Sequence, residues 1–80
     1  MATVLENTLV VDAKGLLCPM PIIKLSQTIN LIAVGQTLEL TATDPGSQHD
    51  VAAWARQTHH ELVDTKKEGK VFTYTVKRTH

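Results

Sequence analysis

The pattern of apolar and polar residues predicts four strands along the chain. Residues 8–12 form a short β-branched run, and residues 36–43 alternate between apolar and polar positions without interruption. Residues 61–65 and 71–76 have the pattern of a hairpin around Glu68 and Gly69. The residues expected to face the core from these strands are Leu38, Leu40, Ala42, Phe72, Tyr74 and Val76.

Two further segments have the period of an amphipathic helix. The apolar face of the first helix follows steps of three, four and three residues: Ile22, Leu25, Ile29 and Ile32. Val34 and Gly35 are expected to close that helix. Ser47 and Asp50 resemble a capping box at the start of the second helix. This helix is expected to bury Val51, Trp54 and Ala55 and to end near His59 and His60.

The order of elements is therefore β-α-β-α-β-β. Two helices packed on one face of a four-stranded mixed sheet bury every apolar stripe, so the predicted fold class is α+β, a two-layer α/β sandwich. The chain of 80 residues is short enough to form one domain, residues 1–80. Aromatic residues make up only 4% of the sequence, so its core must be mainly aliphatic.

Charge excludes some functions and leaves one local question open. The formal net charge is zero, so the sequence does not predict direct binding of nucleic acid through its phosphates. Lysines nevertheless gather near the C-terminus, at positions 66, 67 and 70, with Glu68 among them. Lys66, Lys67 and Lys70 are either a solvated strand edge that discourages pairing with other chains or a patch that contacts an acidic partner or an RNA.

The single cysteine excludes an internal disulfide. One Cys and four scattered His residues include no pair spaced for a tetrahedral metal site, so we expect neither a metal nor a cofactor. The first residues lack the basic and apolar segments of a signal peptide, and no stretch reaches the length of a membrane span. We therefore expect a cytoplasmic monomer that does not bind membranes.

Cys18 lies beside two prolines at the start of the first predicted helix. Both prolines fit a first turn if Cys18 is the N-cap, Pro19 is the first helical residue and Pro21 the third. In that frame the amides of Met20 and Ile22 point outward, and the positive end of the helix dipole lies at the sulfur. Both features favour a thiolate, or an anionic persulfide, over a thiol.

Other interpretations of Cys18 are weaker. A buried, inert cysteine is possible, since free cysteines are often buried. A thioredoxin-like motif is excluded because Pro21 occupies the place of the second cysteine. A hydrolytic pair would need a histidine near Cys18, and the sequence places none beside it.

Residues 11–21 (VDAKGLLCPMP) resemble the signature of the TusA/SirA-type sulfur-carrier proteins, a C-P-x-P motif preceded by D-x-x-G-x-x. The resemblance continues through residues 35–38, 43–45, 50–51 and 60–63, and it extends from about Leu9 to Arg78. It implies a sandwich like the C-terminal domain of bacterial translation initiation factor three. In some members a second cysteine occurs in the second helix, where this chain has Trp54, Ala55 and Arg56.

The resemblance also implies a mechanism and partners. Cys18 would accept sulfane sulfur from a donor protein, such as a cysteine desulfurase or a rhodanese-like protein, and hold it as a persulfide. An acceptor protein with a reactive cysteine would then take the sulfur. The residues expected to shape the Cys18 loop are Asp12, Gly15, Pro19, Met20, Pro21 and Ile22. Asp44 and Asp50 would orient the neighbouring turn and the second helix, or contact partners.

Two other functions stay open at this point. The chain could be a non-catalytic adaptor that docks on a protein or RNA through its lysine-rich edge, or a thiol redox sensor that forms a sulfenic acid or mixed disulfide at Cys18. The destination of the sulfur is open as well: transfer-RNA thiolation, molybdenum-cofactor synthesis and sulfur oxidation are all compatible with the sequence.

Overall fold

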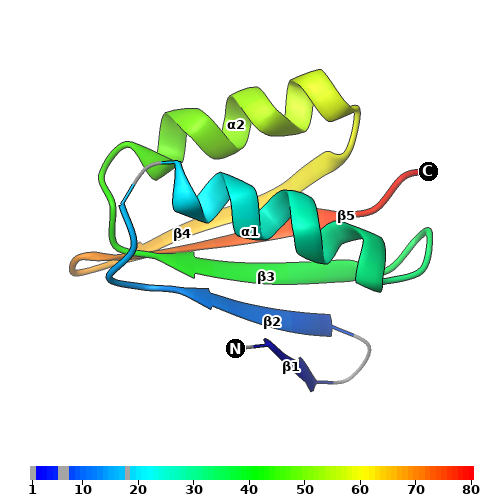
Figure 1. Ribbon diagram of the computed structural model, residues 1–80, viewed down its shortest axis with the longest axis horizontal. Helices are drawn as coiled ribbons and strands as arrows, with labels where there is room; N and C mark the ends of the chain where they lie inside the picture. Colours follow the sequence, from blue (N-terminus) through cyan, green and yellow to red (C-terminus); the bar gives the residue numbers. More distant parts are fainter. Residues whose placement is uncertain (1, 6–7, 18) are drawn as a thin grey trace.

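The computed structural model describes residues 2–5, 8–17 and 19–80, and it forms two helices against one mixed sheet (Figure 1). The elements in chain order are β1 (Ala2–Leu5), β2 (Thr8–Ala13), α1 (Met20–Thr28), the 3-10 turn η1 (Ile29–Leu31), β3 (Thr37–Ala42), α2 (Ser47–Thr58), β4 (Glu61–Glu68) and β5 (Val71–Lys77). Both helices cover the same face of the sheet, which confirms the predicted α+β sandwich.

The sheet contains the four predicted strands and one more. Its order is β1-β2-β3-β5-β4, in which β2 and β3 are parallel and the other neighbours are antiparallel. The additional strand, β1, pairs with β2 at the edge of the sheet, with Ala2 opposite Val11. The sequence analysis did not predict β1, because a strand of four residues has too little alternation to be distinguished from a loop.

The core lies between the helices and the sheet; it includes all the predicted strand residues and also Leu9, Val11 and Ala13 of β2, which were not predicted. Leu38, Leu40 and Ala42 of β3 are fully buried, as are Tyr74 and Val76 of β5. The helices contribute Leu25, Ile29, Val51, Trp54 and Ala55. Trp54 therefore belongs to the core, as predicted, and its indole Nε1 donates a hydrogen bond to Ser26 Oγ at 2.9 Å. No described helix is long and apolar enough to cross a membrane.

The first helix ends earlier than its apolar pattern predicted. α1 stops at Thr28, whose hydroxyl donates to the Lys24 carbonyl at 2.7 Å, and a 3-10 turn follows. Ile32 is already extended, yet it stays buried because the chain folds back over the sheet. Gly35 adopts the left-handed φ of 93° expected of the residue that reverses the chain.

The predicted capping box at Ser47 is wrong. Gly46 is the N-cap of α2, and among the described residues no side chain forms a capping hydrogen bond at this helix start. Ser47 is instead the first helical residue, 1% exposed, and its hydroxyl is hydrogen bonded to the Tyr74 hydroxyl at 2.6 Å. Burial raises the pKa of Tyr74, and the bond from Ser47 opposes part of that rise. The serine therefore connects the start of α2 to the middle of β5.

The C-terminal end of α2 also differs from expectation. The negative end of the helix dipole would favour His59 and His60 as cations. His59 adopts a left-handed φ of 64°, and the pKa of His60 is lowered by burial, then by the nearby His80 and Arg78. The His60 ring stacks between Trp54 and His80, and its Nδ1 accepts the Thr79 amide at 3.2 Å, a bond that needs an unprotonated nitrogen.

We expect Ser47→Ala to lower the free energy of unfolding by about 1–3 kcal/mol, because the buried Tyr74 hydroxyl loses its partner. Tyr74→Phe should cost a similar amount. Denaturant unfolding of both single variants and of the double variant tests the pair: the double variant should lose less than the two single losses added together. Strictly additive losses would show that the two hydroxyls do not interact.

We expect acid to destabilise the fold through His60. The pKa of His60 is lower in the folded protein than in the unfolded chain, so the unfolded chain binds the proton more readily. The free energy of unfolding therefore falls as the pH drops from about 6.5 toward the pKa of His60 in the folded protein. Thermal unfolding between about pH 7.5 and 5.5 measures this loss. His60→Asn retains an acceptor near Thr79 but does not titrate, so its melting temperature should change less over that range. Equal slopes for both proteins would contradict the assignment.

Candidate functional site

The parallel pairing of β2 and β3 brings two loops to the same end of the molecule. Each strand ends at this edge and leads into a helix, and Figure 1 shows both loops on one side. The Gly15 amide in the first loop donates to Thr43 Oγ1 in the second at 2.9 Å. The starts of α1 and α2 therefore lie at one end of the sandwich, together with the segment that contains Cys18.

The loop before Cys18 is fixed by short-range hydrogen bonds. Asp12 Oδ1 accepts the Lys14 amide at 2.9 Å and the Thr41 hydroxyl at 3.3 Å. The Lys14 amide is also the main reason that the pKa of Asp12 lies below its ordinary value. Gly15 has a φ of 81°, a conformation that other residues rarely adopt. Asp12 and Gly15 thus set the path by which the chain leaves the sheet.

Cys18 itself lies outside the described residues, so its exposure and its contacts stay predictions. Its neighbours in the chain are described. Leu17 is 73% exposed and Pro19 is also exposed.

The predicted frame of the first helical turn is wrong by one residue. Pro19 is the N-cap, since its carbonyl accepts the Ile23 amide at 3.1 Å, and α1 begins at Met20. Pro21 is consequently the second helical residue and is buried. Both prolines still occupy positions where a missing N–H costs no helical bond, which is why the sequence could not distinguish the two frames.

The amides predicted to hold an anion are already paired. The Met20 amide donates to the Leu17 carbonyl at 2.9 Å, and the Ile22 amide donates to the Pro19 carbonyl at 3.1 Å. Pro19 and Pro21 have no N–H to offer. Within residues 19–22, the start of α1 therefore provides no unpaired backbone donor, and the expectation that these two amides stabilise the sulfur is not supported.

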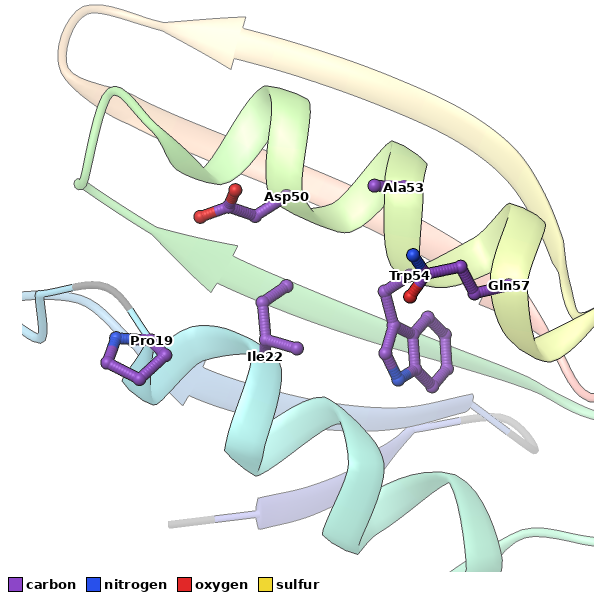
Figure 2. Close-up of a pocket in the computed structure, with 6 residues that line it drawn as sticks. All are labelled: Pro19, Ile22, Asp50, Ala53, Trp54 and Gln57. Atoms are coloured by element: carbon purple, nitrogen blue, oxygen red, sulfur yellow. The ribbon is translucent and has the colours of Figure 1, made fainter.

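A groove of about 240 Å³ runs between the two helices beside Pro19 (Figure 2). Pro19 and Ile22 line it from the side of α1. Figure 2 shows the Asp50 carboxylate near the Pro19 end of the groove and the Trp54 indole reaching toward α1. The remaining lining residues, Ala53 and Gln57, belong to α2. The groove is therefore mostly apolar, with one carboxylate close to the Cys18 segment.

Exposed apolar side chains surround the same segment. Met20 is 40% exposed and Ile23 is 39% exposed, and the two are neighbours on α1 because they lie three residues apart. With Leu17 they form an apolar patch around the position of Cys18, a surface typical of contact with another protein.

The acidic residues expected near the site are in the second loop and helix. Asp44 shapes the turn before α2: its carbonyl accepts the Ser47 amide at 3.0 Å and its Oδ1 accepts the Gly46 amide at 3.3 Å. Asp50 lines the groove.

The candidate lysines are divided between the two faces of the sheet. Lys67 is opposite Phe72, which faces the helices, whereas Lys66 is opposite Thr73 and therefore points to the uncovered face. Lys70 lies in the turn between β4 and β5.

Sequence reasoning missed three contributors to this end of the molecule. Thr43 holds Gly15, and Ala53 and Gln57 complete the groove. Thr43 could have been found, because the end of one parallel strand lies beside the end of the other. Ala53 and Gln57 gave no signal, since their role depends on how α2 packs against α1.

The chemistry available here is that of one thiol on an exposed segment. His60 and His80, whose rings stack 4.5 Å apart, lie at the C-terminal end of α2, whereas Asp50 lies near its start. Those two histidines thus lie at the other end of α2 from the loop that leads to Cys18, whereas His49 is in the first turn of α2.

Comparisons with known proteins give a consistent result. The family model described as "Sulfurtransferase TusA" matches residues 9–78. The sulfur carrier protein TusA of Allochromatium vinosum is 46% identical over 68 residues, which are 85% of this chain and 90% of that protein. The Bacillus subtilis protein YrkF is 42% identical over 74 residues, or 92% of this chain, but the chain spans only 40% of YrkF.

The fold has a solved counterpart. The crystal structure of a SirA-like protein from Desulfitobacterium hafniense superposes with a TM-score of 0.76. The match covers 89% of this chain and 97% of that one at 18% identity, so it supports the fold alone. The sequence matches carry the assignment further: this chain belongs to the TusA family of sulfur carriers.

Proposed function

We propose that Cys18 carries sulfane sulfur as a persulfide and relays it from a donor protein to an acceptor protein. The observation that supports this most directly is the exposure of the segment around Cys18: Leu17 and Pro19 on either side of it are open to solvent. A sulfur that is handed between proteins must be reachable by two different thiols.

The proposed loading step is a thiol exchange that needs no external oxidant. The Cys18 thiolate attacks the outer sulfur of a persulfide on the donor cysteine. A bond forms between Cys18 Sγ and that sulfur, the S–S bond of the donor breaks, and the donor cysteine leaves as a thiolate. In the unloading step an acceptor thiolate attacks the same outer sulfur, and Cys18 leaves as the thiolate.

The rest of the site supports both steps through shape and contact. The apolar patch of Leu17, Met20 and Ile23 offers a surface on which a partner can dock around the thiol. The groove beside Pro19 offers room for a partner's side chain next to Cys18. Since the chain has one cysteine, no second thiol within it can release the sulfur as an internal disulfide.

We expect incubation with a persulfide donor, either a cysteine desulfurase with cysteine or a rhodanese with thiosulfate, to add the mass of one or more sulfur atoms. Intact-protein mass spectrometry detects the change, and a reducing thiol should remove it. Cys18→Ser, which retains the size of the side chain, should gain no mass. Unmodified wild-type protein after reaction with both donor classes would overturn the proposal, and labelling at Cys18 only by peroxide would favour a redox sensor.

We expect Gly15→Ala to slow sulfur loading, because it disturbs the path of the loop that holds Cys18. The added Cβ meets nothing within 4 Å, so its cost arises from the backbone conformation and should be about 1–2 kcal/mol of stability. Denaturant unfolding and the rate of mass gain measure the two effects.

Gly35→Ala is the matched control for this variant. Gly35 also has a positive φ and open space around the added Cβ, but it lies at the opposite end of the sandwich. Gly35→Ala should lose similar stability and load sulfur at the wild-type rate. If both variants load equally slowly, lost stability and not the shape of the loop explains the effect.

A further inference from the structure

A second hollow, of about 360 Å³, lies at the same end of the sandwich as the Cys18 segment. It is formed by the loop between β3 and α2 and by the tip of the β4–β5 hairpin: Thr43, Pro45, Lys67, Lys70 and Phe72. Figure 1 shows the hairpin tip, this loop and the loop that leads to α1 on one side of the molecule. We call it the lysine hollow.

The lysine hollow combines an apolar floor with a cationic rim. The Phe72 ring is buried, and Lys67 Nζ lies 5.5 Å from its centroid, so the ammonium group is held over the ring. Lys67 and Lys70 are exposed, and among the described residues neither has an ion-pair partner. A site of this kind suits a carboxylate at the end of an apolar stem, with the stem over Phe72 and Pro45 and the charge between the lysines.

Thr43 connects the lysine hollow to the loop that contains Cys18. The threonine lines the hollow, and its Oγ1 accepts the amide of Gly15, three residues before the cysteine. A group that fills the hollow thus contacts the residue that anchors the Cys18 loop. A partner seated there is positioned at the end of the molecule where sulfur exchange would occur.

We infer that the lysine hollow receives an aspartate or glutamate side chain of the donor protein that loads Cys18. This inference rests on the proposed function and adds the chemistry by which the donor is recognised. Opposite charges at the rim of a protein interface accelerate the encounter and fix its orientation. The lysines would therefore act on docking and not on the reactivity of the sulfur.

A protein carboxylate fits the hollow better than an RNA backbone. RNA binding through phosphates needs a continuous run of positive charge. Here Glu68 lies between the two lysines in sequence, Asp44 lies between Thr43 and Pro45, and the formal net charge of the chain is zero. The lysine hollow is a local cationic site whose size suits one side chain.

Lys66 provides a matched control for Lys67. The two residues are adjacent in β4 and carry the same charge, but Lys67 lines the hollow while Lys66 points to the uncovered face of the sheet. Lys66→Glu and Lys67→Glu change the net charge equally. Any effect of overall charge should appear in both variants, whereas an effect of the lysine hollow should appear only in the second.

The experiment measures the second-order rate constant for loading by the donor that loads the wild-type protein fastest. We expect Lys67→Glu and Lys70→Glu to reduce this constant about tenfold, and Lys66→Glu to change it less than about twofold. Lys67→Arg should retain the wild-type rate. Raising the salt to about 0.5 M should slow loading of the wild type but not of Lys67→Glu.

Unloading by dithiothreitol, a small uncharged thiol, tests whether docking is the step affected. Its rate should be the same for wild type and Lys67→Glu, because no charged partner is involved. Slower unloading of Lys67→Glu would assign the lysine to the reactivity of Cys18 and overturn the inference.

The inference would also be overturned if Lys67→Glu were loaded at the wild-type rate, or if Lys66→Glu and Lys67→Glu reduced the loading rate constant equally. It would likewise be overturned if Lys67→Glu lost transfer-RNA binding in a mobility-shift assay while its loading rate stayed unchanged. These results leave sulfur loading itself intact and so bear on the lysine hollow alone. If no donor loads the wild type, the proposed function fails and this inference falls with it.

Discussion

The parallel pairing of β2 with β3 is the constraint on which the arrangement of this protein depends. Two parallel neighbours end at the same edge of the sheet, so the chain between them must cross back over it, here through α1, and β3 then leads into α2 from that same edge. Both helix starts, both loops before them and the tip of the β4–β5 hairpin consequently share one end. The bond from Gly15 to Thr43 joins the two loops, and the bond between Ser47 and Tyr74 fastens the second helix to the sheet.

The two prolines have a different role from the one their positions suggest at first. They determine where α1 begins, and together with the local bonds of Met20 and Ile22 they leave this helix start without a spare donor within residues 19–22. The amides of residues 19–22 therefore do not account for a preference of Cys18 for its anionic form, whereas the polarity of the helix would favour that form.

Much of the fold could be predicted because its apolar pattern is strict. The alternation around Leu38 and Leu40 is compatible only with a strand, and the spacing of Leu25 and Ile29 only with a helix, with these residues facing the core. The predictions failed where a side chain had two possible partners. Ser47 could cap α2 or bond to Tyr74, and only packing against β5 decides between them. The pKa of His60 could be raised by the helix dipole or lowered by burial, and burial beside Trp54 lowers it.

The candidate site divides in the same way. The motif around Cys18 and the family were evident from the residues themselves. The groove was not evident, because it exists only where α1 and α2 meet, and neither helix alone indicates that Ile22 would line a groove with residues of α2. The distinction between Lys66 and Lys67 likewise needed the register of β4 against β5, which contains an irregularity between Leu62 and Asp64.

The apolar patch, the lysine hollow and the Pro19 end of the groove lie at one end of the sandwich, so the proposed donor and acceptor would compete for it. The proposed relay would then follow a ping-pong order, in which the first partner leaves before the second partner binds. Throughput then depends on how briefly each complex lasts. Selection on such a surface would favour rapid dissociation over tight binding.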